Sequence, residues 1–425
     1  ALLGLYILTS VFKSNDEDVV SLFSKDFTGR PIFNATMSVK RYEILNRCLR
    51  FDDAQTRAQR KITDNTAPIT ELFNRLIDNS QNVYCLSTNV TIDEMLVPFR
   101  GRWRHRVFMP NKPKKYGVKI MCLTDSKTSY FYNGYIYSGK DSDGVGLTAE
   151  EKRFSKPSQC VIRLSKPIQG SNRNITADNY FSSVQLVDEL EKRHLTYVGT
   201  VRKNKKEIPP QFLPSSGRPI GSSLYGFDGI KTLLSYVPNK NKSVILISTM
   251  HHSIETDEAT GKPEIISFYN HTKCGVDLID MKCAVYSSNR RTRRWPMAVF
   301  YRMVNIASIN GYILFLSYSG SPLITRFQFT KELGEDLIKP HLQRRLQIPN
   351  LRRDVKETIQ KILGNNEAAV QPQVPDDKME KRKTCASCPS VKQRKTAYKC
   401  IKCSKPVCLE CSRKVCKDCA IECVK

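Results

Sequence analysis

Residues 174–201 read NITADNYFSSVQLVDELEKRHLTYVGTV, and this stretch decides the class of fold. NITA and TYVGT are short β-rich runs. VQLVDELEK between them carries apolar residues three and four positions apart, the spacing of a helix with one buried face. Ser182 or Ser183 can cap that helix, because a serine side chain accepts a hydrogen bond from the free N–H groups at a helix N-terminus. A strand–helix–strand unit of this kind predicts a mixed α/β sheet.

The chain before this unit divides by the period of its apolar residues. Residues 1–88 mainly carry apolar positions three and four apart and are predicted to be helical. From about residue 89 the pattern changes to β-rich runs bounded by turn residues. These runs are NVTIDEMLVPF (89–99), GVKIMCLTDS (117–126), YFYNGYIYSG (130–139) and QCVIRLS (159–165).

The sequence after the opening stretch predicts an insertion, a return to the sheet, and then helices. Residues 202–262 are rich in Lys, Pro, Ser and Gly around one clear strand, SVILIST, and are predicted to form β hairpins. EIISFYN (264–270) is predicted to return to the sheet. Pro296, well placed in the first turn of a helix, opens a long buried helix. Two more helices are predicted over residues 330–346 and 352–364, followed by a polar linker.

The chain carries 68 Lys and Arg residues against 41 Asp and Glu, a net charge of +27 over 425 residues. Such an excess predicts attraction to a polyanion, above all nucleic acid, whereas solubility alone does not require it. A chain of this length is expected to divide into two to four domains. It opens with ALLGLYILTSVF, as if inside a domain, so we expect residues to precede it and predict no signal peptide. No apolar run is expected to approach the ~18–20 residues of a membrane helix.

Four aspartates occupy positions where a carboxylate needs a partner. Asp93 lies in the apolar run VTIDEMLV, and Asp178 ends the run NITAD just before a loop and a helix. Asp277 begins a helix in HTKCGVDLIDMKC, and Asp280 lies one turn later on the same face. A carboxylate in a core strand is costly unless it is paired or binds a cation. Each aspartate alone can be a cap or turn residue, but together they favour a Mg²⁺ site for phosphoryl transfer.

Two basic stretches support this interpretation. The first spans residues 100–119, contains no acid and includes Trp103 and Tyr116; the second, at 290–294, precedes Trp295. Basic side chains neutralise phosphates, and an aromatic ring can stack on an exposed base. The alternative is a solvated charged face with a packing tryptophan. The predicted DNA contacts are Arg100, Arg102, Arg104, Arg106, Lys112, Lys114, Lys115, Lys119, Arg290, Arg291, Arg293 and Arg294.

Five blocks of the sequence resemble the piggyBac family of DNA transposases, or proteins derived from piggyBac transposable elements. In the family's order they are RCLRFDD (47–53), TIDEMLVPFRGR (91–102), TADNYFSS (176–183), YNHTKCGVDLIDMKC (269–283) and NRRTRRWPMAVFYRMVNIASIN (289–310). The resemblance covers essentially the whole chain. Two features differ from the family: its acidic N-terminal region is absent, and Cys274 occupies a position where glycine is common.

The resemblance implies an α/β fold with an RNase H-like catalytic core. Asp93, Asp178 and Asp277 match the family's catalytic metal-binding triad, and Asp280 matches a further acidic position near it. It also implies Mg²⁺ or Mn²⁺ as cofactor and double-stranded DNA as partner, with no membrane and no small-molecule substrate. The protein is expected to be a homodimer in the nucleus. It is expected to cut at transposon ends, to leave the donor DNA by way of hairpinned ends, and to insert at TTAA targets.

The resemblance also implies a division of the chain into segments. A helical dimerisation and DNA-binding domain comprises residues 1–88 and 287–362, the catalytic domain comprises 89–201 and 263–286, and a β-rich insertion comprises 202–262. A linker over 363–383 leads to a cysteine-rich zinc-binding domain at 384–425.

Nine of the fifteen cysteines fall in the last 41 residues, a pattern that predicts metal ligation rather than disulfides. Each of four CxxC pairs presents two thiolates to a tetrahedral ion, so two Zn²⁺ are predicted. Alternating pairs would form a cross-brace zinc finger, with Cys385, Cys388, Cys408 and Cys411 on one ion, Cys400, Cys403, Cys416 and Cys419 on the other, and Cys423 left over. The spacing also suits RING and PHD modules, which would transfer ubiquitin or read histone tails, but the basic charge of this segment suits DNA better.

The sequence therefore predicts a dimeric, metal-dependent DNA transposase. One alternative is a domesticated DNA- or chromatin-binding protein that keeps the fold without the reaction. A zinc-finger ubiquitin ligase is a third possibility, but it leaves the aspartates and the first basic stretch unexplained.

Overall fold

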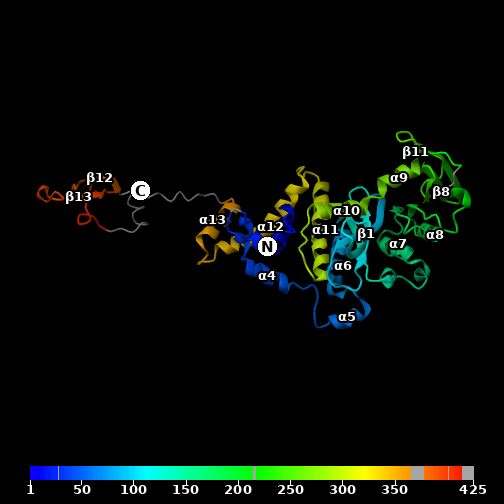
Figure 1. The fold of residues 1–425 in the computed structure, drawn as a ribbon, viewed down its shortest axis with the longest axis horizontal. Coiled ribbons are helices and arrows are strands. Elements are labelled where there is room, and N and C mark those ends of the chain that lie inside the picture. Colours follow the sequence, from blue (N-terminus) through cyan, green and yellow to red (C-terminus); the bar gives the residue numbers. More distant parts are fainter. Residues whose placement is uncertain (27, 214–216, 365–377, 401, 414–425) are drawn as a thin grey trace. The chain divides into compact units, whose positions relative to one another are not determined.

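A computed structural model describes residues 1–26, 28–213, 217–364, 378–400 and 402–413. The chain forms two compact units, residues 1–347 and residues 348–425, whose elements Figure 1 labels. The predicted catalytic aspartates lie in the larger unit, and the cysteine-rich segment lies in the smaller one.

One nine-stranded sheet organises the larger unit, in the order β2-β3-β1-β5-β6-β9-β8-β7, with β4 paired to β3. Its strands are β1 (Asn89–Pro98), β2 (Val107–Phe108), β3 (Tyr116–Asp125), β4 (Phe131–Ile136), β5 (Asn174–Ala177), β6 (Thr196–Thr200), β7 (Ser223–Asp228), β8 (Lys231–Asn239) and β9 (Lys242–Ser248). β1, β5 and β6 are parallel, whereas the pairs β1–β3, β3–β4 and β6–β9 are antiparallel. β5 and β6 therefore end together beside the middle of β1, because Ala177 is in register with Ile92 and Gly199.

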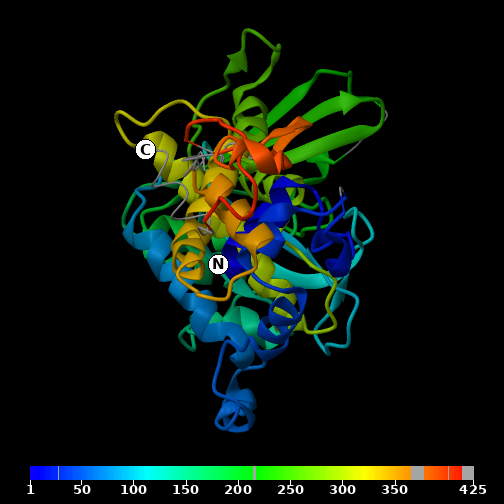
Figure 2. The same cartoon turned by 90° about the vertical axis from the view of Figure 1, so that its left-hand side faces the viewer.

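The helices follow most of the sequence-based predictions. In chain order they are α1 (Leu2–Val11), α2 (Val19–Leu22), α3 (Pro31–Thr36), α4 (Val39–Cys48), α5 (Arg57–Thr63), α6 (Ala67–Asn82), α7 (Lys156–Ser165), α8 (Val184–Lys192), α9 (Glu264–Thr272), α10 (Gly275–Val285), α11 (Trp295–Ser317), α12 (Arg326–Leu346) and α13 (Arg353–Ile362). Ser183 caps α8 by accepting a hydrogen bond from the Leu186 N–H, as one of the two predicted caps. Figure 2 shows α5, the blue helix at the bottom of the view, apart from the sheet, and none of its residues is buried.

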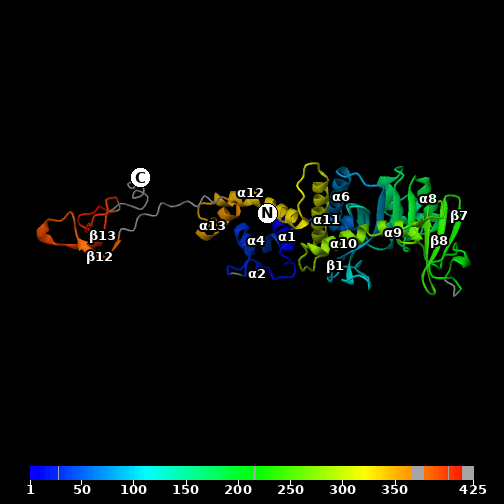
Figure 3. The same cartoon turned by 90° about the horizontal axis from the view of Figure 1, so that it is seen from above.

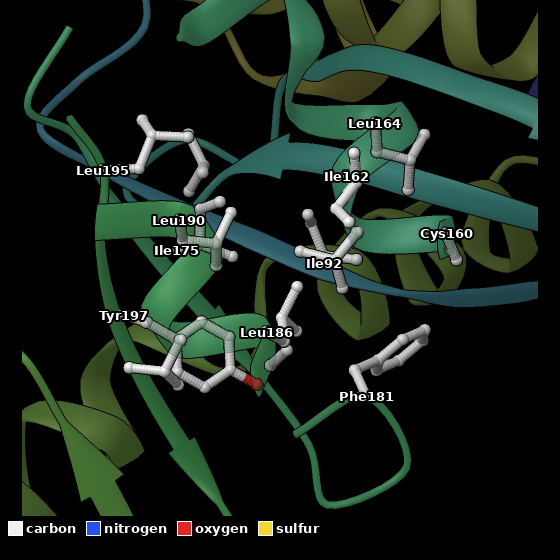
Figure 4. Close-up of a cluster of buried hydrophobic side chains, with 14 of the residues drawn as sticks. Ile92, Cys160, Ile162, Leu164, Ile175, Phe181, Leu186, Leu190, Leu195 and Tyr197 are labelled. Carbon is white, nitrogen blue, oxygen red and sulfur yellow. The ribbon is translucent and has the colours of Figure 1, made fainter. Parts of the chain in front are cut away.

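Helices cover both faces of the sheet, so β1 is apolar on both sides. Val90 and Ile92 point into a first core with α7 and α8, which Figure 4 shows. Met95 and Val97 point into a second core with α6, α10 and α11. Figures 1 and 3 show α6 and α11 on one side of β1 and α8 on the other. Because side chains alternate along a strand, even-numbered residues of β1 face the first core and odd-numbered residues face the second.

The helices at the two ends of the larger unit pack together, as predicted. α1 and α12 approach each other at two glycines, since a Cβ atom at Gly4 would lie 2.7 Å from the Gly334 carbonyl oxygen. Arg345 of α12 also donates hydrogen bonds to the carbonyl oxygens of Asn34 and Ala35. The first and last helical segments of this unit therefore share one packed region.

Two segments predicted as strands are helices. Residues 159–165 belong to α7, whose N-terminus is capped by Ser155 and carries a proline in its first turn. Residues 264–270 belong to α9, which follows Pro263 and packs Ile265 against β6, β8 and β9. Short apolar runs fit the period of either a strand or a buried helix. Here the Ser155 cap and the prolines at the starts of α7 and α9 favour the helix.

Two further expectations need correction. The strands within residues 202–262 form hairpins as predicted, but β9 pairs with β6, so they extend the main sheet. A small ladder of β10 (Thr256–Asp257) and β11 (Lys262–Pro263) lies beyond them. In the predicted linker, β12 (Lys378–Thr384) pairs with β13 (Lys395–Tyr398).

Helix α11 is long and apolar enough to cross a membrane, contrary to the expectation that no run approaches that length. Half of its most apolar window is buried within the protein. Three polar side chains of this helix, Arg302, Asn305 and Asn310, are also buried, and each makes hydrogen bonds to other elements. This is the pattern of a core helix.

Candidate active site and cysteine cluster

Asp93 and Asp178 are neighbours on two parallel strands. Ile92 of β1 is in register with Ala177 of β5, so the two aspartates occupy the next register position. Ile92 and Ala177 both point into the first core. Since successive side chains of a strand point to opposite faces, the two carboxylates lie on the other face, which α10 covers.

Three buried threonines tie these strands to the chain just before α10. Thr91 Oγ1 donates a hydrogen bond of 2.6 Å to the carbonyl oxygen of Thr272, and Thr176 Oγ1 donates one of 2.8 Å to Thr272 Oγ1. Thr91 and Thr176 lie two residues before Asp93 and Asp178, so each shares a strand face with an aspartate. We did not predict these threonines, although the repeated T-x-D pattern in TIDEM and TADN is a signal for them.

A glycine lets α10 approach the sheet closely. A Cβ atom at Gly275 would lie 2.5 Å from Thr124 Oγ1 and 2.6 Å from Thr91 Oγ1, closer than such atoms can pack. Gly275 is the first residue of α10, and Asp277 lies in its first turn. The glycine therefore fixes how near the third carboxylate lies to the strands that carry the other two.

The carboxylates on the strands are crowded and poorly solvated. Burial, together with the carboxylates of Glu94 and Asp178, raises the pKa of Asp93 to about 8. Burial also raises the pKa of Asp178, although the Tyr180 N–H donates a hydrogen bond of 2.8 Å to it. A cation between such groups would favour their charged forms.

Lys112 supplies a positive charge at this place. Its Nζ atom lies 3.1 Å from Asp277 Oδ1 and 3.4 Å from the Glu94 carbonyl oxygen. Burial lowers the pKa of Lys112, but the carboxylates of Asp277, Asp93 and Asp280 outweigh burial, and the pKa is raised. We predicted Lys112 as a DNA contact, whereas the structure pairs its ammonium group with a predicted metal ligand.

Asp280 has a different partner. Its Oδ1 atom accepts a hydrogen bond of 2.8 Å from Arg302 Nη1, and the Arg302 side chain is almost fully buried in α11. A buried guanidinium needs such a carboxylate, because an unpaired charge in the core is costly. Asp280 therefore links α10 to α11 through Arg302.

The predicted DNA contacts divide into two groups. Arg290 and Arg294 each donate a hydrogen bond of 2.6 Å to a backbone carbonyl oxygen of the N-terminal helical region, at Ser14 and Leu49. These two arginines link their own segment to the N-terminal helical region. Lys119 is half-buried. The exposed members are Arg100, Arg102, Arg104, Arg106, Lys114, Lys115, Arg291 and Arg293.

The two tryptophans pack against each other. The Trp103 and Trp295 rings are stacked with centroids 4.7 Å apart at 19°, so the two basic stretches meet there. Tyr116 lies beneath the guanidinium groups of Arg100 and Arg106. Trp103 therefore packs against Trp295, as the packing alternative expected.

An aromatic side chain that we did not predict lies beside the carboxylates. Tyr180 follows Asp178 by two residues, is 38% exposed, and has the cationic groups of Lys119 and Arg202 within 6 Å of its ring centroid. A cavity of about 500 Å³ next to it is lined by Asn179, residues 200–204 and residues 243–245. The sequence signal for this tyrosine is the run DNY directly after a predicted strand.

Four cysteines of the smaller unit converge as predicted. Their sulfur atoms lie within 4.8 Å of one another, and Cys388 Sγ lies 3.6 Å from both Cys408 Sγ and Cys411 Sγ. Tetrahedral zinc with Zn–S bonds of about 2.3 Å places sulfurs about 3.8 Å apart. A hydrogen bond from the backbone N–H of Cys411 lowers the pKa of Cys408 to about 7, which favours the thiolate. The fourth member is Cys385.

The second predicted zinc set is only partly within the described residues. Cys400 and Cys403 are described, whereas Cys416, Cys419 and Cys423 lie outside the described residues. Within the part of the chain that the structure describes, the four converging cysteines are the one group of three or more potential ligands gathered within 4.8 Å. The carboxylate oxygens of Asp93, Asp178 and Asp277 are therefore not gathered within 4.8 Å of one another.

The model of the family described as Transposase IS4 matches residues 1–312, so the chain belongs to a family of transposases. Among solved structures, the chain is similar to piggyBac transposase in a cryo-EM synaptic complex with hairpin DNA. The two are 38% identical with a TM-score of 0.79, and the match covers 98% of this chain and 86% of that one. The chain belongs to the piggyBac family of transposases.

Two human relatives are also similar. PiggyBac transposable element-derived protein 3 of Homo sapiens is 20% identical over 276 residues, which cover 61% of this chain and 46% of the relative. PiggyBac transposable element-derived protein 2 is 24% identical over 291 residues, which cover 64% and 48%. The chain therefore matches about half the length of these curated relatives.

Proposed function

We propose that the protein is a cut-and-paste DNA transposase whose divalent metal ions are held by Asp93, Asp178 and Asp277. The observation that carries this proposal is the placement of the carboxylates. Two occupy one register position of neighbouring parallel strands, and the third lies in the first turn of the helix that covers them. The strand order β4-β3-β1-β5-β6, with β3 antiparallel and β5 parallel to β1, supports an RNase H-like core.

The donor set suits a hard divalent cation. Carboxylate oxygens are the ligands that Mg²⁺ and Mn²⁺ prefer, and the site already accommodates the Lys112 ammonium group beside Asp277. Asp93, Asp178 and Asp277 would hold these ions, which would supply activation of a water or a 3′-hydroxyl and stabilisation of the leaving oxygen. Asp280 keeps α10 in place through Arg302.

The remaining residues serve DNA binding in this proposal. The exposed arginines and lysines of residues 100–115, with Arg291 and Arg293, neutralise DNA phosphates. Tyr180 and Arg202 contact the strand at the site, because an exposed ring can stack on a base. By analogy with the piggyBac transposase complex, which holds hairpin DNA, the substrates are transposon ends and TTAA targets.

The smaller unit completes the proposal. Cys385, Cys388, Cys408 and Cys411 hold one Zn²⁺, and the CxxC pairs at 400–403 and 416–419 hold a second. The strongly basic module then recognises transposon ends. We place the protein in the nucleus as a homodimer, with residues 1–88 and 287–362 as the dimerisation and DNA-binding region.

A second function is a domesticated DNA-binding protein without the reaction. It is favoured by the human relatives, which are named as proteins derived from a transposable element. The aspartates themselves favour the active enzyme. Burial raises the pKa of Asp93 and of Asp178, so these two carboxylates are costly for a binder that holds no cation there.

The test is nicking of a supercoiled plasmid that carries TTAA sites, in Mg²⁺ and in Mn²⁺. We expect metal-dependent nicking by the wild type, and at least a 100-fold loss in Asp178→Asn and in Asp277→Asn, because each removes a metal ligand. Circular dichroism checks that both variants are folded. Asp228→Asn, a change at an exposed carboxylate of β7, is the matched control. DNA that is bound but never cut in either metal would favour the domesticated binder.

A further inference from the structure

Lys112 differs from the other basic residues of its loop. The loop joins β2 to β3 and is closed by hydrogen bonds from the Met109 N–H to the Lys115 carbonyl oxygen (2.8 Å) and from the Lys112 N–H to the Met109 carbonyl oxygen (3.3 Å). The Lys112 side chain is 19% exposed, whereas Lys114 and Lys115 are exposed. Lys112 therefore points into the protein, where the other two lysines face solvent.

The inward side chain ends among the residues proposed to hold metal. Its ammonium group lies 3.1 Å from Asp277 Oδ1 and 3.4 Å from the carbonyl oxygen of Glu94, the residue after Asp93. This is the one ion pair of Asp277 among the described residues. An ammonium group and a divalent ion cannot both bind the same carboxylate oxygen closely, because like charges repel at such distances.

We infer that Lys112 is a positioning residue that competes with the divalent metal ion for Asp277. The inference rests on the proposed function, since it requires a metal ion at Asp277. Without metal, the ammonium group holds Asp277 toward Glu94 in the middle of the aspartate-bearing strand β1. When the ion binds, Lys112 leaves Asp277, and its flexible four-carbon stem lets it reach a DNA phosphate.

This arrangement couples metal binding to DNA binding. A phosphate that pairs with Lys112 takes the ammonium group away from Asp277 and so strengthens metal binding there. By thermodynamic linkage, the metal ion strengthens DNA binding by the same factor. A lysine that only fastened its loop would have the opposite effect, because removing it would loosen the site and weaken metal binding.

Mn²⁺ binding to the zinc-loaded full chain tests the inference, with electron paramagnetic resonance reporting free Mn²⁺. Lys112→Met should bind Mn²⁺ about threefold or more tightly than wild type, because a partly exposed ion pair no longer competes. A short DNA duplex should tighten Mn²⁺ binding in the wild type but not in Lys112→Met, after subtraction of the Mn²⁺ that the duplex binds. Lys112→Arg should behave like the wild type.

The controls separate the possible failures. Lys192→Met makes the same change at an exposed position of α8, outside the basic stretches, and should leave Mn²⁺ affinity unchanged. Weaker or unchanged binding in Lys112→Met would overturn the inference, provided that Asp277→Asn loses Mn²⁺ binding. If Asp277→Asn binds Mn²⁺ like the wild type, the metal ion is not at this site, and the proposed function fails with the inference.

Discussion

Asp93 is the residue of the site whose charge depends most on its surroundings. Burial and the nearby carboxylates of Glu94 and Asp178 raise its pKa to about 8, from an ordinary value of 3.8. Between about pH 4 and pH 8 the folded protein therefore holds a proton that the unfolded chain releases. The stability that this proton confers is present at low pH and is lost as the pH rises toward 8.

We predict that Asp93→Asn changes this pH dependence when no Mg²⁺ or Mn²⁺ is added. From pH 5 to pH 8.5, the melting temperature of the wild type should fall relative to that of the variant, because asparagine carries no charge. Saturating Mg²⁺ at pH 8 should raise the melting temperature of the wild type by a few degrees and that of the variant by less. Differential scanning calorimetry measures both, and a difference that is constant with pH would contradict the prediction.

At the scale of elements, the site depends on how α10 meets the sheet. Thr272, just before α10, accepts hydrogen bonds from Thr91 of β1 and Thr176 of β5. The ion pair between Asp280 and Arg302 fixes α10 to α11. The helix is therefore held on two sides, and Gly275 decides how closely its first turn approaches β1 and β3.

Gly275→Ala is predicted to separate α10 from the sheet. The added Cβ would lie 2.5 Å from Thr124 Oγ1, so the first turn must shift and carry Asp277 with it. A displacement of about 1 Å at a catalytic group can lower activity about 100-fold, while overpacking costs about 1–3 kcal/mol of stability. Plasmid nicking and urea unfolding measure the two effects.

Gly311→Ala on α11 is the matched control for this change. Its Cβ would lie 3.6 Å from Phe329, an ordinary contact, so activity should be unchanged and the helix slightly stabilised. Equal nicking by the Gly275→Ala and wild-type proteins would show that the close approach of α10 is not needed.

At the scale of the whole molecule, the two units use different kinds of stabilisation. The larger unit has two extensive apolar cores on either side of one sheet. In the smaller unit, β12 is exposed along most of its length, and the buried cysteines Cys385 and Cys408 belong to the converging cluster. Among the described residues of this unit the apolar core is small, and we propose that a metal ion stabilises the fold of the cysteine-rich segment.

We predict that Cys408→Ser removes one Zn²⁺ per chain, because an alcohol is a poor replacement for a zinc-bound thiolate. Binding to transposon ends should weaken, while metal-dependent nicking of plasmid by the larger unit should persist. Zinc content by atomic emission and DNA binding by fluorescence anisotropy measure these effects. Cys48→Ser, at an exposed cysteine outside the cluster, is the control. Unchanged zinc content in Cys408→Ser would contradict the prediction.

The sequence by itself determined the family, most of the helices and the acidic residues of the candidate site. Its long amphipathic and apolar segments have one period over many residues, and the CxxC pairs have a spacing that leaves few alternatives. Short runs were less informative. Residues 159–165 and 264–270 are apolar enough for strands, and caps and prolines outside the runs made them helices.

Only the tertiary structure decided which charged residues are partners. Arg290 and Arg294 resemble Arg291 and Arg293 in the sequence, yet the first two bind backbone carbonyl oxygens and the others are exposed. Lys112 is bonded to Asp277 across 165 positions of the chain, and Asp280 to Arg302 in the core. Such pairings depend on how close two remote segments of the chain lie in the fold and on how deeply their side chains are buried. The strength of a charge interaction is set by the folded surroundings and not by the residue type.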